Sequence, residues 1–221
     1  VYKRQLLGNG LRVVTCDMPH TRSVAIAVYV GVGSRHESAH RAGVSHFVEH
    51  MLFKGTSQMP SAREISESIE GTGGVLNAST EHELTSYWCR VAIPHFEDSL
   101  ALLLDLLGNS LFEIENIEKE RLVIIEELNM INDYPTAKVD ALIDEMLWPD
   151  HPLGRDIAGT KESISAMAQE DLLDHLGSHY VASNIVVSVA GNIDHDETVG
   201  LVAGLAESWP TGAPPSPKSV G

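Results

Sequence analysis

Two histidines and a glutamate in the segment His46-Phe47-Val48-Glu49-His50 have the residue types and the spacing of a metal site. If the segment is helical, His46 and His50 lie one turn apart on one face, so both imidazoles can reach a single ion. Glu49 projects beside them, where its carboxylate could take a proton from a metal-bound water. The pattern alone is a weak indication, since roughly one chain in twenty of this composition would contain it by chance. The ordinary alternative is a pair of exposed histidines on a solvated helix.

A third ligand is available from three glutamates, Glu120, Glu126 and Glu127, in the helical pattern over 116–132. Glu120 and Glu127 are two turns apart and share a face, whereas Glu126 points about 100° away from Glu127. A catalytic zinc site takes three protein ligands and leaves one position open for water, which two histidines and one carboxylate satisfy. Helix spacing does not decide which glutamate joins the histidines, and acidic residues on a helix are most often simply solvated.

The helix that must hold the histidines can be traced in the hydrophobic pattern. We predict it over 42–53, because the apolar residues there repeat at helical spacing and form one stripe. At about 100° per residue, that stripe lies nearly opposite the His46, Glu49 and His50 side chains. The helix is therefore expected to bury one face and to present its chemical face to a cavity. The stripe consists of Val44, Phe47, Val48, Met51 and Leu52.

The order of the elements predicts an α+β fold with a mixed or antiparallel sheet and helices packed on it. Strands come first, a block of helices follows, and one β-branched strand returns near the end. The strand over 24–33 alternates strictly between bulky and mostly small residues, so its two faces should meet different surroundings. The predicted strands are a hairpin over 3–16, then 24–33, 75–80, 84–93 and 184–190; the predicted helices are 42–53, 62–71, 94–147 with breaks near 110–113 and 133–135, 169–180 and 196–208.

The last twelve residues, 210–221, differ in composition from the rest of the chain. They include four prolines, two glycines and two serines. A segment of this kind cannot pack a core and is typical of a linker. We therefore expect one domain over 1–209, followed by a linker to a further part of the protein.

Charge and composition exclude several classes of protein. Of the 221 residues, 43% are apolar, which is enough to fill a core and too many for a mostly disordered chain. The formal net charge of −16 argues against a nucleic-acid binder, whose surface would be basic. No stretch of the sequence reads as a membrane span. Cys16 and Cys89 have neither metal nor disulfide-framework spacing, so we expect reduced thiols and a cytoplasmic or other reducing compartment.

The metal motif and its surroundings together resemble the pitrilysin, insulysin and mitochondrial-processing-peptidase family of zinc metallopeptidases, which carries an inverted zinc motif. A glutamate 77 positions after His50 matches the third ligand of that family. The resemblance covers essentially residues 3–209. The segments that carry it are His46-x-x-Glu49-His50 with Met51–Thr56, Asn77-Ala78-Ser79-Thr80, Glu120-Arg121-x-Val123-x-x-Glu126-Glu127 with Met130 and Asp133-x-Pro135, His151–Arg155, Gly159 and Gly191-Asn192.

The resemblance implies a role for each residue of the motifs. His46, His50 and Glu127 would hold one zinc ion per chain, and Glu49 would act as the general base. Glu120 matches a second acidic position that supports the site. The residues Asn77, Ala78, Ser79 and Thr80 resemble the edge strand on which family members lay an extended peptide substrate by main-chain hydrogen bonds.

The resemblance also implies a larger assembly. Family members are built from two homologous halves, and this chain resembles only the first, metal-bearing half. A homologous second half or partner subunit, in a dimer or a longer chain, is therefore expected, and the chain alone should bind zinc but cleave peptides poorly. Two other hypotheses stand beside a zinc endopeptidase acting on peptides or presequences. One is a non-catalytic structural or partner subunit of the same family, and the other is a peptide-binding module without turnover.

Overall fold

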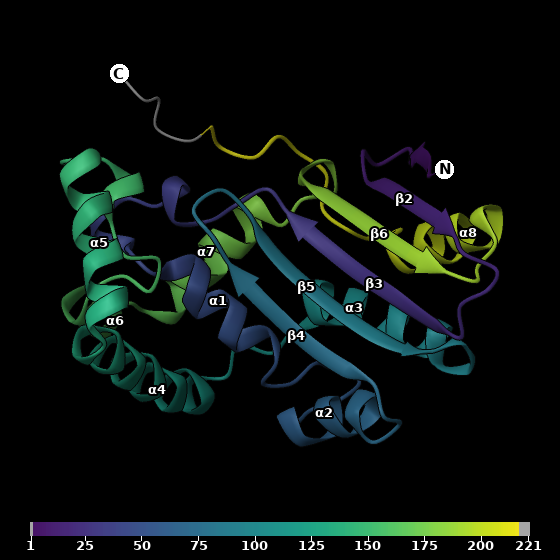
Figure 1. Cartoon of the computed structure of the whole chain (residues 1–221), viewed down its shortest axis with the longest axis horizontal. Helices are drawn as coiled ribbons and strands as arrows, with labels where there is room; N and C mark the ends of the chain where they lie inside the picture. The colour runs from purple at the N-terminus through teal and green to yellow at the C-terminus, as the bar shows by residue number, and fades with distance from the viewer. Residues whose placement is uncertain (1, 217–221) are drawn as a thin grey trace.

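A computed structural model describes residues 2–216, within which one six-stranded sheet has the strand order β1-β2-β6-β3-β5-β4 (Figure 1). Strand β6 comes last in the sequence but lies between β2 and β3, parallel to the first and antiparallel to the second. The other strand pairs are antiparallel, so the sheet is mixed. The strands are β1 (Lys3–Leu6), β2 (Arg12–Asp17), β3 (Ser23–Val30), β4 (Val75–Thr80), β5 (Thr85–Ala92) and β6 (Ile185–Gly191).

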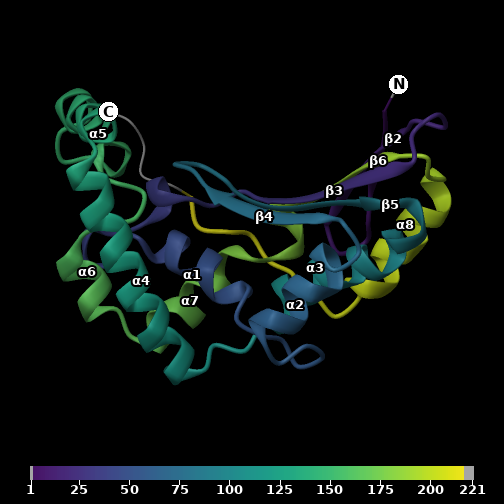
Figure 2. The same cartoon turned by 60° about the horizontal axis from the view of Figure 1, so that its bottom comes forward.

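Helices α1, α2, α3, α7 and α8 lie on one side of this sheet, and α4, α5 and α6 gather at one end of the molecule (Figure 2). This arrangement confirms the predicted α+β class. The helices are α1 (Val44–Leu52), α2 (Ala62–Glu70), α3 (Phe96–Asn109), α4 (Ile114–Asp133), α5 (Pro135–Leu147), α6 (Lys161–Ala166), α7 (Gln169–His179) and α8 (His195–Leu205), with 3₁₀ turns at Ser34–His36, Ala39–Arg41, Ile93–His95, Pro152–Gly154 and Ala182–Asn184.

The alternation in β3 explains why the helices cover one face of the sheet. Successive side chains of a strand point to opposite faces, and here Ile26 and Val28 are fully buried while Ala25 and Tyr29 are exposed. The bulky face packs on the helices and the small-residue face is left open. The hydrophobic core therefore lies between the sheet and the helix layer, and α1 contributes its whole apolar stripe to that core.

The helical block over 94–147 divides at the two predicted breaks. Ser110–Glu113 separates α3 from α4. Tyr134 separates α4 from α5, because the helical conformation is unfavourable for a residue that precedes a proline. Helix α6 was not predicted, since six residues are too few to show an apolar period. A capping box between Thr160 and Ser163 starts it.

Residues 211–216 form neither helix nor strand, and the rest of the predicted linker, 217–221, lies outside the described residues. Within residues 2–216, no helix combines the length and the hydropathy that crossing a bilayer requires. Cys16 and Cys89 are both free thiols.

Candidate metal centre

Helix α1 presents the two histidines and Glu49 on the side opposite its buried stripe. All five apolar residues of the stripe are buried, so the helix cannot rotate without exposing them. The side chains of His46 and His50 keep 18% and 17% of their surface exposed. Both imidazoles therefore lie partly buried at the wall of a cleft, as the amphipathic pattern predicted.

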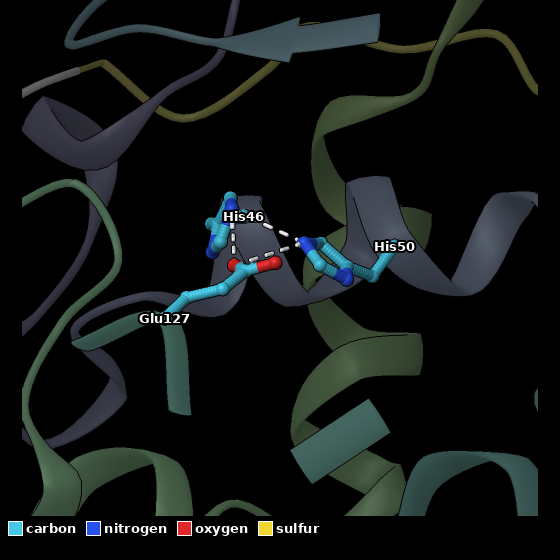
Figure 3. Close-up of side chains that lie close together, drawn as sticks. All are labelled: His46, His50 and Glu127. Carbon is cyan, nitrogen blue, oxygen red and sulfur yellow. Dashed lines mark hydrogen bonds and ion pairs between the residues drawn. The ribbon is translucent and has the colours of Figure 1, made fainter. Parts of the chain in front are cut away.

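Helix α4 brings Glu127 to these histidines, and the three side chains point toward one another (Figure 3). The Nε2 atoms of His46 and His50 are 3.2 Å apart, and Glu127 Oε2 lies 3.8 Å and 3.5 Å from them. A tetrahedral zinc ion with bonds of about 2.0–2.1 Å holds its ligand atoms roughly 3.3–3.4 Å apart. The three side chains therefore fit one zinc ion with only small adjustments.

The structure separates the two glutamates that helix spacing left open. Glu126 is exposed, and its carboxylate accepts a hydrogen bond from Asn129 Nδ2 at 3.3 Å on the surface of α4. Glu127 is the one that joins the histidines within 4.8 Å. The choice follows from how α4 is rotated against α1, which is a property of the packing between the two helices.

Glu120 lies behind the cluster formed by His46, His50 and Glu127, and it contacts His50. Its Oε2 atom accepts from His50 Nδ1 at 3.0 Å, and its Oε1 atom from Lys54 Nζ at 2.7 Å. Burial alone would raise the pKa of Glu120, but the hydrogen bonds from His50 and Lys54 hold it below the ordinary value. A proton fixed on Nδ1 of His50 leaves the Nε2 lone pair free for a cation.

His46 differs from His50 in what surrounds its ring. Burial, reinforced by the neighbouring His50, lowers the pKa of His46 to about 4, so its imidazole is neutral at pH 7 and able to bind a metal. Among the described residues, however, nothing forms a hydrogen bond with its buried Nδ1 atom. Of the two Nδ1 atoms, that of His50 has a partner among the described residues and that of His46 has none.

Glu49 lies beside the cluster and is held by the end of β4. Its Oε2 atom accepts a hydrogen bond from the hydroxyl of Thr80. Burial raises the pKa of Glu49, an effect opposed by the Thr80 hydrogen bond and by His50. A carboxylate with a raised pKa is better suited to hold a proton during a reaction near neutral pH.

Strand β4 runs past this carboxylate at the edge of the sheet, beside β5. Two hollows lie along it. One, of about 320 Å³, is lined by Asn77 and Ala78, and the other, of about 450 Å³, by Ser79 and Thr80. Glu49 lines both. The four residues singled out in the sequence thus lie beside the cluster, and an extended peptide along this edge would pass Glu49.

Thr80 was expected on the substrate-binding strand, but its hydrogen bond to Glu49 was not predicted, and neither was the contact of Lys54 with Glu120. Thr80 is 31 residues from Glu49, and Lys54 is 66 residues before Glu120, so no periodicity connects either pair. Helix α7 carries two further histidines, His175 and His179, four residues apart. Among the described residues, neither belongs to a group of three or more side chains able to hold an ion.

Comparison with known proteins identifies the family. The sequence pattern described as "Insulinase (Peptidase family M16)" matches residues 12–161, more than half of the chain. The chain belongs to peptidase family M16. The pattern described as "Peptidase M16 inactive domain" matches residues 166–221, a segment that includes β6 in the middle of the sheet.

Curated relatives of this M16 chain are named zinc proteases. It is 43% identical over 199 residues to an uncharacterized zinc protease of Mycobacterium leprae, covering 90% of this chain and 44% of that protein. It is 41% identical over 191 residues to the uncharacterized zinc protease YmxG of Bacillus subtilis, covering 86% and 46%. The M16 chain therefore spans slightly less than half the length of these relatives.

Two solved structures share the fold of this chain. A protease from Helicobacter pylori superposes with a TM-score of 0.94 at 25% identity, over 99% of this chain and 53% of that one. Pitrilysin superposes with a TM-score of 0.90 at 24% identity, over all of this chain and 24% of that one, which shows the fold alone. The α+β architecture and the family resemblance seen in the sequence are both confirmed.

Proposed function

We propose that this chain is a zinc-dependent endopeptidase domain. The observation that carries the proposal is the convergence of His46, His50 and Glu127. The carboxylate of Glu49, which is on the same helix as the two histidines, lies beside them at an open sheet edge. The zinc protease names of the M. leprae and B. subtilis relatives support the choice of metal. One zinc ion per chain would be held by the two Nε2 atoms and the Glu127 carboxylate.

Zinc at this site would supply a Lewis acid that lowers the pKa of a water molecule and polarises the peptide carbonyl. Glu49 accepts the proton of the attacking water and then delivers it to the leaving amine nitrogen. Its raised pKa suits this transfer, since the carboxyl group must hold the proton between the two events. Glu120 keeps His50 in the tautomer that offers Nε2, and Thr80 fixes the carboxylate of Glu49.

The substrate in this proposal is an extended peptide that adds a strand to the free edge of β4 at Asn77–Thr80. The hollow beside Ser79 and Thr80 is also lined by three aspartates, Asp140, Asp144 and Asp156, and by Arg155. A cavity with this many carboxylates favours a cationic side chain of the substrate. Peptides or presequences with a basic residue close to the cleaved bond are therefore the expected substrate class.

The proposed domain is one part of a larger enzyme. Residues 1–209 form the zinc-bearing unit and 210–221 the linker, and the partner is a homologous second half or subunit. The relatives, about twice as long as this chain, support that arrangement. The chain alone should therefore bind zinc but cleave peptides slowly, because the second half would add further contacts to the substrate.

The test combines metal analysis with one substitution. Elemental analysis of protein purified without added metal or a histidine tag should find about one zinc per chain. In the full-length protein, Glu49→Gln should keep the zinc and lower kcat for a fluorogenic peptide at least about 1,000-fold. Wild-type turnover by Glu49→Gln would refute the base assignment. A chain that takes up no zinc even when it is supplied would favour the non-catalytic subunit, and Glu49-independent peptide affinity without turnover would favour the binding module.

A further inference from the structure

The metal-bearing helix α1 begins without a cap of its own. Its N-cap residue is Gly43, which has a φ of 89° and no side chain to accept a hydrogen bond. The first N–H groups of a helix need acceptors from elsewhere, and a carboxylate is a favourable one because it also meets the positive end of the helix dipole. Glu37, six residues upstream, supplies this carboxylate. Its Oε2 atom accepts from the Gly43 N–H at 2.7 Å and its Oε1 atom from the Ser45 N–H at 2.8 Å.

A glycine is required at the start of α1, so an ordinary capping side chain is excluded there. A Cβ atom on Gly43 would come within 2.5 Å of the Ala158 carbonyl oxygen, and one on Gly159 within 2.3 Å of the Ala42 oxygen. The two backbones are thus in direct contact. Because no side chain fits between them, the cap has to come from another segment, and Glu37 provides it.

The Glu37 carboxylate is enclosed and fully used. The residue is 6% exposed, and each of its two oxygens accepts one N–H of α1. Arg155 Nη2 donates to the main-chain oxygen of Glu37 at 2.5 Å, which fixes the residue from the other side. Water cannot easily replace a buried carboxylate of this kind, so its loss would leave two N–H groups of the first turn without an acceptor.

The first turn of α1 is also where His46 is located. His50, one turn later, is oriented by Glu120 through its Nδ1 atom. The Nδ1 atom of His46 has no hydrogen-bond partner among the residues that the structure describes. The position of the His46 ring therefore depends on the backbone of the first turn and on its packing, and that backbone is held by Glu37.

We propose that Glu37 is a positioning residue of the metal site, which fixes His46 through the backbone of α1 as Glu120 fixes His50 through its side chain. This role rests on the proposed function, since it matters to catalysis only if His46 is a metal ligand. It assigns to Glu37 an effect on metal affinity that a residue serving only general stability would not have.

The test is zinc affinity in Glu37→Gln. The amide group would place a donor against one of the two N–H groups, so the first turn of α1 should loosen. We expect the zinc Kd to rise about 10-fold, which is the lower end of the effect of residues that contact metal ligands. Metal-free protein provides a second measurement. Amide hydrogen exchange should become faster at Gly43 and Ser45 but stay unchanged in the sheet. The Co²⁺-substituted variant should also show an altered visible spectrum.

Two control variants separate positioning from stability. Asp194 caps α8 with the same chemistry, accepting from the N–H groups of Asp196 and Glu197 at 2.8 Å and 3.0 Å. Asp194→Asn therefore removes a carboxylate cap at the end of the molecule away from α1 (Figure 1). Ile26→Val removes one methyl group from the fully buried centre of β3 and so lowers the stability of the fold. Both should bind zinc within about 2-fold of wild type.

Each outcome decides the proposal. Wild-type zinc affinity and a wild-type Co²⁺ spectrum in Glu37→Gln would overturn the role of Glu37 and leave the proposed function intact. A wild-type protein that binds no zinc would overturn the proposed function and this role with it. If Glu37→Gln does not fold, Glu37→Asp replaces it. The shorter carboxylate should reach only one of the two N–H groups and raise the Kd by a smaller factor, and an unchanged Kd would again reject the proposal.

Discussion

Glu126 and Glu127 are adjacent in the sequence and have the same chemistry, yet only Glu127 lies with His46 and His50. They therefore form a matched pair for testing the third ligand. Glu127→Gln should lose most of the zinc, because a neutral amide oxygen is a poor zinc ligand, whereas Glu126→Gln should keep about one zinc per chain. Elemental analysis after dialysis measures the zinc content of both variants. Equal zinc content in the two variants would show that the third ligand is a different group.

The hydroxyl of Thr80 is a second residue whose effect can be isolated. It donates to Glu49 Oε2, so its loss should allow the proposed base to change rotamer while the metal ligands stay in place. We expect Thr80→Val, which preserves shape, to lower kcat about 10-fold with little change in KM, and Thr80→Ser to stay near wild type. Steady-state kinetics of the full-length protein measure both. A rise in KM without a fall in kcat would instead place Thr80 in peptide binding.

At the scale of elements, the packing of α7 on α1 makes stability depend on pH. His175 Nε2 lies 3.1 Å from Ser45 Oγ, and the rings of His175 and His179 are 4.7 Å apart. Burial, with the neighbouring histidines, lowers the pKa of His175 to about 3 and that of His179 to about 4. Both stay neutral in the folded protein, whereas in the unfolded chain they take up protons below a pH of about 6.5.

The stability that the neutral His175 and His179 contribute is therefore fully present above about pH 6.5, and it is lost as the pH falls toward 4. Each histidine should reduce the free energy of unfolding by about 1.4 kcal/mol per pH unit in that range. Urea unfolding of metal-free protein at pH 7.5, 6.0 and 5.0 measures the slope. In His175→Gln the slope should fall by about the share of one histidine. The same slope in this variant and in wild type would contradict the assignment.

The elements also show what the sequence could and could not predict. The buried stripe of α1, the breaks around α4 and the alternation of β3 are local patterns, and all appeared as predicted. The insertion of β6 between β2 and β3 depends on pairing over more than 150 residues, for which a single sequence carries no periodic signal. Helix spacing likewise could not choose Glu127, because the choice depends on how two helices pack.

At the scale of the whole molecule, the net charge of −16 and the acidic hollow beside Ser79 make different predictions about substrate binding. A diffuse negative charge attracts any cationic peptide from a distance, and at 0.1 M salt this attraction is largely screened beyond about 10 Å. A localised set of carboxylates acts on one substrate residue at short range. The proposed preference for basic peptides could arise from either, so the experiment must change one while keeping the other constant.

Paired substitutions achieve this separation. Asp140→Asn with Asp144→Asn removes two charges from the lining of the hollow, and Asp196→Asn with Glu197→Gln removes two from the first turn of α8. In full-length wild-type protein, the KM for an arginine-containing peptide should rise about 10-fold between 50 and 500 mM salt. The KM for its neutral analogue should change less than about 2-fold. If the hollow binds the arginine, only the first pair should raise the low-salt KM and flatten its salt dependence. Equal effects of the two pairs would mean that the overall charge, and not the hollow, selects basic peptides.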